Sequence, residues 1–352
     1  MHIASLRSHL QEGHVIPAQP LALDAQRRFS ERHQKAITRY YVDAGSGGLA
    51  VGVHSTQFEI RDPAHGLFQP VLELAAQTID ASLAQNPRPF AKISGVCGPT
   101  SQAVKEAEFA KSLGYDAGLL SLAALKNATE EELIAHCRAV SEVYPIIGFY
   151  LQPAVGGRPL SYAFWRRFAE IPHVAAIKMA PFNRYQTFDV VRAVVEAGRD
   201  DIILYTGNDD TIVTDLLTPF VVDVDGKKIT RWIAGGLLGH WGVWTQKAVE
   251  LLDQIKKARE LKSITLQWLT KAAAVTDMNA ALFDAAHKFA GCIPGILEVL
   301  RRQGLTPSIC CLNPHETLSK GQAEELDRVY KAYPELTDDS FVAENLERWL
   351  SD

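Results

Sequence analysis

The chain has 352 residues, of which 47% are hydrophobic, and its 36 lysines and arginines stand against 41 aspartates and glutamates, a net charge of −5 at pH 7. A chain of this length buries a large core, as one large α/β domain with additions or as two ordinary domains. The charges are scattered and form no basic face, so nucleic acid is not an expected partner. No apolar run approaches the ~18 residues that a membrane span needs, so no membrane partner is expected either.

The five cysteines are an odd number and contain no Cys-x-x-Cys spacing. This usage is typical of reduced, mostly structural thiols. The segment from Met1 to Pro20 has no apolar core of the length that a signal peptide needs. Together these features predict a cytoplasmic protein.

Short apolar runs alternate with longer amphipathic ones through the first two thirds of the chain. The apolar runs predict eight strands, over 15–19, 47–53, 90–94, 116–122, 145–151, 173–180, 202–205 and 232–238. The amphipathic runs predict helices over 29–44, 64–85, 99–113, 129–143, 161–170, 184–197 and 210–217, with another starting at 243.

Strict strand–helix alternation implies parallel strands joined by right-handed crossovers. Eight such units over about 250 residues predict an α/β protein with a (β/α)8 TIM barrel. The alternative is an open doubly wound sheet, which usually has a glycine-rich first turn. The turn after Gln19 has no G-x-G-x-x-G pattern, which favours the barrel.

Two further features interrupt or follow the barrel pattern. Alternating residues on both sides of Asp225-Gly226 predict a β-hairpin inserted near 220–232. After Lys247 the strand pattern stops, and helices are predicted over 245–261, 263–275, 278–290, 294–302, 319–333 and 340–350. The predicted domains are therefore a barrel over 1–246 and an all-helical C-terminal region over 247–352.

Lys178 lies inside the apolar run between Pro172 and Pro181. An ammonium group in a buried strand is costly unless it is paired or its pKa falls. Burial favours the neutral amine, which is a nucleophile that forms a Schiff base with a carbonyl group. The alternative is a lysine at a strand end that extends its amine to water.

Three predicted strands end in reactive side chains: Lys178 on the sixth, Tyr150 on the fifth, and His54, Ser55 and Thr56 after the second. Chemistry in a (β/α)8 barrel takes place at the C-terminal ends of the strands. Tyr150 and Lys178 are expected to face one cavity if both point inward, where a tyrosine would move protons during imine formation. Hydroxyl and backbone N–H groups near Ser55 and Thr56 would hold a carboxylate or oxyanion.

The sequence resembles the dihydrodipicolinate synthase / N-acetylneuraminate lyase superfamily of class I, Schiff-base-forming lyases, from about Val15 to about Lys247. The matching segments are Tyr-Leu-Gln-Pro at 150–153, Ala-Ile-Lys-Met-Ala at 176–180 and Thr-Gly-Asn-Asp at 206–209. The tyrosine and the lysine, 28 positions apart, are specific as a pair.

This resemblance implies that Lys178 forms an imine with a 2-oxo acid such as pyruvate and that Tyr150 is the general acid/base. It also implies that Gly207 and Gly236 help bind the substrate with the 54–56 segment. By the same resemblance, the chain works without a cofactor as a homodimer or homotetramer.

Two departures from the family pattern shape the functional prediction. The family's Gly-Thr-Thr-Gly-Glu loop is Val-His-Ser-Thr-Gln at 53–57, and the stretch 121–124, where the synthases carry a further tyrosine, has no aromatic residue. An aldolase or dehydratase acting on a 2-oxo or keto-sugar acid is therefore predicted. The alternatives are a dihydrodipicolinate synthase proper and a non-catalytic barrel that binds a metabolite.

Three smaller points stay open at this stage. His54 either replaces part of the lost proton relay or only fills the loop. Asp209 and Asp210 are either a carboxylate pair or, as the favoured prediction, caps of the next helix. No His-x-His or carboxylate cluster was found with metal-ligand spacing, so no metal site is predicted.

Overall fold

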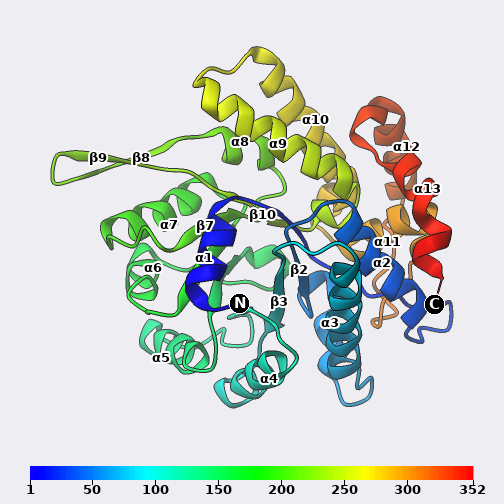
Figure 1. Cartoon of the computed structure of the whole chain (residues 1–352), viewed down its shortest axis with the longest axis horizontal. Coiled ribbons are helices and arrows are strands. Elements are labelled where there is room, and N and C mark those ends of the chain that lie inside the picture. The colour runs from blue at the N-terminus through cyan, green and yellow to red at the C-terminus, as the bar shows by residue number, and fades with distance from the viewer. Residues whose placement is uncertain (352) are drawn as a thin grey trace. The chain divides into compact units, whose positions relative to one another are not determined.

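The structure (Figure 1) is a computed structural model that describes residues 1–351. The chain divides into two compact units. The first unit consists of Met1–His14 and Ala91–Leu237. The second unit consists of Val15–Phe90 and the chain from Leu238 onward.

The first unit contains a parallel sheet in the order β10-β7-β6-β5-β4-β3. Its strands are β3 (Ala91–Val96), β4 (Ala117–Leu120), β5 (Ile146–Leu151), β6 (Val174–Ala180), β7 (Ile203–Thr206) and β10 (Gly235–Leu238). Every residue of β6 is buried, which explains why all of its residues except Lys178 are apolar instead of alternating with polar ones. The register places Lys178 between Phe149 of β5 and Tyr205 of β7.

Helices follow the strands of the first unit in turn. They are α4 (Thr100–Ser112), α5 (Glu130–Ser141), α6 (Tyr162–Phe168), α7 (Arg184–Glu196) and α8 (Ile212–Leu217). The start of α5 has a capping box in which Thr129 and Glu132 bond each other's backbone N–H groups. This pattern was readable in the sequence, and the predicted helix begins where the structure has it.

One helix of the first unit was not predicted. Helix α1 (Ile3–Gln11) lies against the N-terminal ends of the strands, where Arg7 donates hydrogen bonds to the carbonyl oxygens of Pro172 and Val174. The amino group of Met1 forms an ion pair with Asp116, just before β4. The helix is short and follows no predicted strand, so the strand–helix alternation gave no signal for it.

The predicted hairpin is confirmed as β8 (Phe220–Val224) and β9 (Lys227–Arg231), an antiparallel pair that reaches past α7 in Figure 1. Its turn residues Asp225 and Gly226 have φ values of 51° and 80°. Positive φ at both central positions is what a tight two-residue hairpin requires, and Asp-Gly accepts it at low cost.

The second unit contains two parallel strands, β1 (Val15–Pro17) and β2 (Gly48–Val51), joined by backbone bonds such as Gln19 N–H to the carbonyl of Ala50. Helices α2 (Glu31–Asp43) and α3 (Phe68–Gln85) flank β2 in the chain. The C-terminal helices are α9 (Thr245–Leu261), α10 (Leu266–Leu282), α11 (Cys292–Arg302), α12 (Gln322–Ala332) and α13 (Asp339–Leu350).

One predicted helix boundary in this region is wrong. The chain was expected to break between 275 and 278, but α10 continues to Leu282. The break occurs at Asp284, whose φ of 57° is incompatible with a right-handed helix.

The strands β1 to β7 and β10, with the helices that follow them, are those of a (β/α)8 TIM barrel with a C-terminal helical extension. This confirms the predicted fold class. The two compact units do not follow the predicted boundary between residues 246 and 247, which stays a prediction about domains. Among residues 1–351, no helix combines the length and the apolar character needed to cross a membrane.

Candidate active site

Lys178 is buried near the C-terminal end of β6, with 8% of its surface exposed. Its Nζ lies 4.4 Å from the centre of the Phe149 ring. Burial lowers the pKa of the Lys178 amine from 10.5 to about 8, and the carboxylate of Asp209 opposes this shift. The amine is buried and not in solvent, so the alternative of a lysine that extends its amine to water is wrong.

Gly207 is packed against the Lys178 side chain. A Cβ atom at this position would lie 2.6 Å from Lys178 Cε and 2.8 Å from Ala180 Cβ. The backbone N–H of Gly207 donates to the carbonyl of Met179 at 2.6 Å, which fixes this close approach. Any larger residue at 207 would therefore displace the amine.

The loop from Thr206 to Asp209 is held by the buried carboxylate of Asp215. This carboxylate accepts hydrogen bonds from Thr206 Oγ1 at 2.7 Å and Asn208 Nδ2 at 2.9 Å, and it forms an ion pair with Arg184. Burial raises the pKa of Asp215, and the hydrogen bonds and Arg184 oppose that shift. The network fixes the loop that carries Gly207 and Asp209 beside Lys178.

The favoured expectation for Asp209 and Asp210, that they cap the next helix, is wrong. The residue that precedes α8 is Thr211, so neither aspartate occupies the N-cap position of that helix. Asp209 is instead a buried carboxylate whose charge acts on Lys178. The sequence hinted at it only through the position of the acidic pair at the end of the seventh strand.

Tyr150 does not point toward Lys178. It is in register with Met179, one residue beyond Lys178, and successive side chains of a strand point to opposite faces. Its ring packs against Trp165 of α6, 5.4 Å between ring centres, and its hydroxyl bonds both the N–H and the carbonyl of Leu160. The premise that both side chains point inward is therefore not met.

The Val53–Gln57 segment belongs to the second unit and forms a single 3-10 turn, His54–Thr56. The Ser55 hydroxyl donates to the carbonyl of Ala18 at 2.9 Å, and the Thr56 hydroxyl donates to that of Gln19 at 2.7 Å. His54 has its ring centre 6.0 Å from that of Phe58. Both hydroxyls hold the backbone after β1, and the Thr56 hydroxyl also accepts the N–H groups of Gly52 and Val53. The substrate-binding role of His54, Ser55 and Thr56 stays a prediction.

Gly236 lies on β10 in register with Thr206, and its N–H donates to the carbonyl of His14 at 3.1 Å. Its substrate-binding role also stays a prediction. His240, which follows β10, is fully buried, and burial lowers the pKa of its imidazole to about 4. It is neutral at physiological pH and bonded to Asn279, which suits a structural role.

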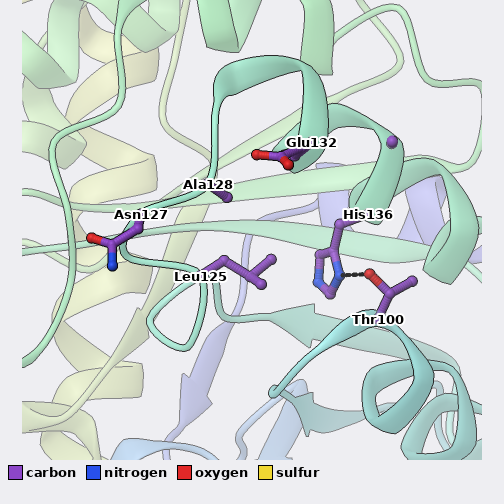
Figure 2. A pocket seen from close by; sticks show the side chains of 7 residues that line it. Thr100, Leu125, Asn127, Ala128, Glu132 and His136 are labelled. Carbon is purple, nitrogen blue, oxygen red and sulfur yellow. Dashed lines mark hydrogen bonds between the residues drawn. The ribbon is translucent and has the colours of Figure 1, made fainter.

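A separate pocket of about 560 Å³ lies between α4, α5 and the loop after β4 (Figure 2). Figure 2 shows His136 of α5 hydrogen-bonded to Thr100 at the start of α4, with 2.9 Å between His136 Nδ1 and Thr100 Oγ1. Burial lowers the pKa of His136, so its imidazole is neutral. The pocket contains no lysine among its lining residues and is not the imine site.

A (β/α)8 barrel that buries an amine of lowered pKa near the end of its sixth strand has the architecture of the class I, Schiff-base-forming lyases. The chain belongs to the dihydrodipicolinate synthetase family, whose model matches residues 12–220, more than half of its length.

One curated relative is the 4-hydroxy-tetrahydrodipicolinate synthase of Dechloromonas aromatica, 29% identical over 164 residues, which are 46% of this chain and 52% of that protein. The chain thus spans about half the length of the curated relatives it matches.

Two solved structures share the fold. The N-acetylneuraminate lyase from Fusobacterium nucleatum is 16% identical, with a TM-score of 0.70 over 92% of this chain and 99% of that one. The dihydrodipicolinate synthase from Acinetobacter baumannii, solved in complex with pyruvate, is 18% identical, with a TM-score of 0.72 over 91% of this chain and 98% of that one.

Proposed function

We propose that the protein is a lyase, an aldolase or a dehydratase, that binds a 2-oxo acid such as pyruvate as a Schiff base on Lys178. The burial of the Lys178 amine near the C-terminal end of β6, which lowers its pKa, is the observation that carries this proposal. The neutral amine attacks the carbonyl carbon to give a carbinolamine, and loss of water gives the imine. Loss of a proton from the adjacent carbon then gives an enamine, which attacks the second substrate to form a new bond. In the cleavage direction, breaking that bond in the imine of the larger substrate gives the same enamine, which is then protonated.

The size of the pKa shift decides whether this chemistry is practical near neutrality. With a pKa of about 8, roughly one amine in ten is neutral at pH 7; with the usual 10.5, roughly one in three thousand is. Burial therefore increases the nucleophilic fraction by a factor of roughly 300. This gain is what the apolar surroundings of β6 contribute to the reaction.

The other site residues enter the proposal with different support. Gly207 leaves the space in which the amine lies, and Asp209 is the carboxylate whose charge acts on it. Substrate binding by His54, Ser55, Thr56 and Gly236 is proposed from the family resemblance. General acid/base catalysis by Tyr150 stays a prediction, because its hydroxyl bonds Leu160.

We further propose that the protein is a cytoplasmic homo-oligomer that uses no cofactor. Five cysteines that form no disulfide within the described residues support a reducing compartment. The complex of the Acinetobacter baumannii synthase with pyruvate supports a small 2-oxo acid as the first substrate.

Two alternatives remain for the reaction. A dihydrodipicolinate synthase proper is favoured by the name of the curated relative, but the 121–124 stretch has no aromatic residue for the synthases' proton relay. A non-catalytic barrel that binds a metabolite is favoured by the altered 53–57 loop.

Borohydride trapping tests the proposal. The protein is incubated with pyruvate, reduced, and analysed by intact mass and peptide mapping. We expect one pyruvate-sized adduct on Lys178, absent in Lys178→Ala and retained in Lys257→Ala, which removes an exposed lysine of α9. No adduct with pyruvate or a panel of other 2-oxo acids would reject the lyase proposal and favour the metabolite-binding barrel.

A further inference from the structure

Two histidines and a glutamate meet where α1 ends. His9 lies in the last turn of α1, Glu12 directly follows the helix, and His14 precedes β1. One nitrogen of each imidazole and one oxygen of the carboxylate all lie within 4.8 Å of one another. The two rings are stacked, with centres 4.0 Å apart, and His14 Nε2 is 3.6 Å from the Glu12 carboxylate.

The backbone that carries these side chains is held in place on both sides. The buried hydroxyl of Tyr205 donates to the carbonyl of Leu10 at 2.9 Å and accepts the N–H of His14 at 3.1 Å. Gly235 allows the His14 backbone to approach, because a Cβ atom there would lie 2.4 Å from the His14 carbonyl oxygen. The His14 carbonyl also accepts the N–H of Gly236. The ends of the cluster are thus positioned before any ligand arrives.

The spacing is close to that of a metal site. Imidazole nitrogens and carboxylate oxygens lie about 2.0–2.2 Å from Zn²⁺, so two ligand atoms of one tetrahedral ion are about 3.3–3.6 Å apart. The ligand atoms of the cluster, which lie within 4.8 Å of one another, must therefore approach by up to about 1.5 Å, by rotation of the stacked rings and of Glu12. Glu12 has 66% of its side chain exposed and is free to rotate.

We propose that His9, Glu12 and His14 bind a divalent transition-metal ion, with Zn²⁺ the best match to two imidazoles and a carboxylate. This ligand set leaves a fourth position for water. The ion would join the end of α1 to the residue that enters β1. The site lies with α1 at the N-terminal ends of the strands, whereas Lys178 lies toward the C-terminal end of β6. The proposal is therefore independent of the proposed lyase function.

Metal titration of the full chain tests this site. After EDTA treatment and dialysis, Zn²⁺ binding is measured by calorimetry, and Co²⁺ binding by visible absorption. We expect one ion per chain and a higher melting temperature with Zn²⁺, because an ion that binds only the folded chain stabilises it. Loss of outer groups around a metal weakens binding 10–100-fold, so loss of a direct ligand in His14→Ala or Glu12→Gln should weaken it at least about tenfold.

Two variants serve as controls. His2→Ala removes an exposed histidine at the other end of α1, and Lys178→Ala removes the proposed imine lysine; both should bind Zn²⁺ as the wild type does. Glu12→Gln changes an exposed side chain, so the test does not depend on a variant that fails to fold. Three results would each overturn the proposal. The first is the absence of one-to-one Zn²⁺ binding, and the second is wild-type Zn²⁺ affinity in both Glu12→Gln and His14→Ala. The third is a cysteine-to-cobalt charge-transfer band, which would show that cysteines bind the metal.

Discussion

The protonation of Lys178 is set by two opposing effects, burial of the amine and the charge of Asp209. Burial is the larger effect and lowers the pKa, while the carboxylate raises it. We predict that Asp209→Asn lowers the pKa of Lys178 further below about 8. The pH at which borohydride trapping reaches half of its maximum rate should then move to lower pH. An unchanged midpoint would show that Asp209 does not act on the amine.

The same burial predicts a pH-dependent cost in stability. Below pH 8 the lysine is charged in both states, and a depression from 10.5 to about 8 destabilises the folded chain by on the order of 3 kcal/mol. This cost disappears as pH rises from about 8 to 10.5, because the unfolded state binds more protons in that range.

Lys178→Met is therefore expected to be more stable than the wild type at pH 7, by up to about 3 kcal/mol, and the difference should shrink as pH approaches 10.5. Urea denaturation at several pH values measures it. A control is Lys257→Met, at an exposed position, which should show no such trend. A variant equal to the wild type at pH 7 would contradict a buried, destabilised amine.

At the scale of elements, Asp215 of α8 connects the loop after β7 to Arg184 of α7. Asp215→Ala would remove the carboxylate that Thr206, Asn208 and Arg184 share. Asn208 would keep its bond to Thr187, and Arg184 would keep its bond to Thr218. Hydrogen bonds to a charged group contribute about 1.5–3 kcal/mol each, so we expect unfolding free energy to fall by about 2–4 kcal/mol. Chemical denaturation measures the effect, with Asp189→Ala, at a partly exposed aspartate of α7, as the comparison. Equal unfolding free energies for the two variants would contradict the prediction.

The register between β5 and β6 explains why Tyr150 does not face Lys178 as the sequence predicted. Ile146 pairs with Val174, and a spacing of 28 carried along the strands would place Tyr150 opposite Lys178. The pairing shifts by one residue between Ile146 and Ile147, so Phe149 lies opposite Lys178 instead. A one-residue shift moves every later side chain to the other face, and no feature of the sequence marks it.

This register leads to a prediction for Tyr150→Phe. Because the hydroxyl bonds Leu160 and not Lys178, we expect the rate of pyruvate trapping to stay within about tenfold of the wild type. Single-turnover trapping followed by mass spectrometry measures this. A loss of about 10²–10⁴-fold, as expected for removal of a general acid or base, would support the sequence-based role instead.

For the whole molecule, the sequence predicted the barrel well because its signal is spread over many residues. Eight apolar runs that alternate with amphipathic ones still predict the barrel when one element boundary is misplaced. The Asp225-Gly226 turn is a strong local signal for the hairpin. The site was harder to predict, because it depends on single side-chain directions. Lys178 was found from its apolar neighbours, whereas the grouping of His9 with His14 requires the folded position of α1.

The predicted homo-oligomer has a testable surface at the corner between α9 and α10. Leu261, Ile264, Leu266 and Leu269 are 77%, 48%, 80% and 52% exposed there. Grouped exposed apolar side chains are costly in a monomer and are typical of contact surfaces. We expect light scattering to give the mass of a dimer or tetramer, and Leu266→Glu with Leu269→Glu to lower it, because two carboxylates resist burial. Val221→Glu, which changes an exposed residue of the hairpin, is the control and should keep the wild-type mass. A monomeric wild type would reject the predicted oligomer. An unchanged mass in the double variant would show that this corner is not the contact surface.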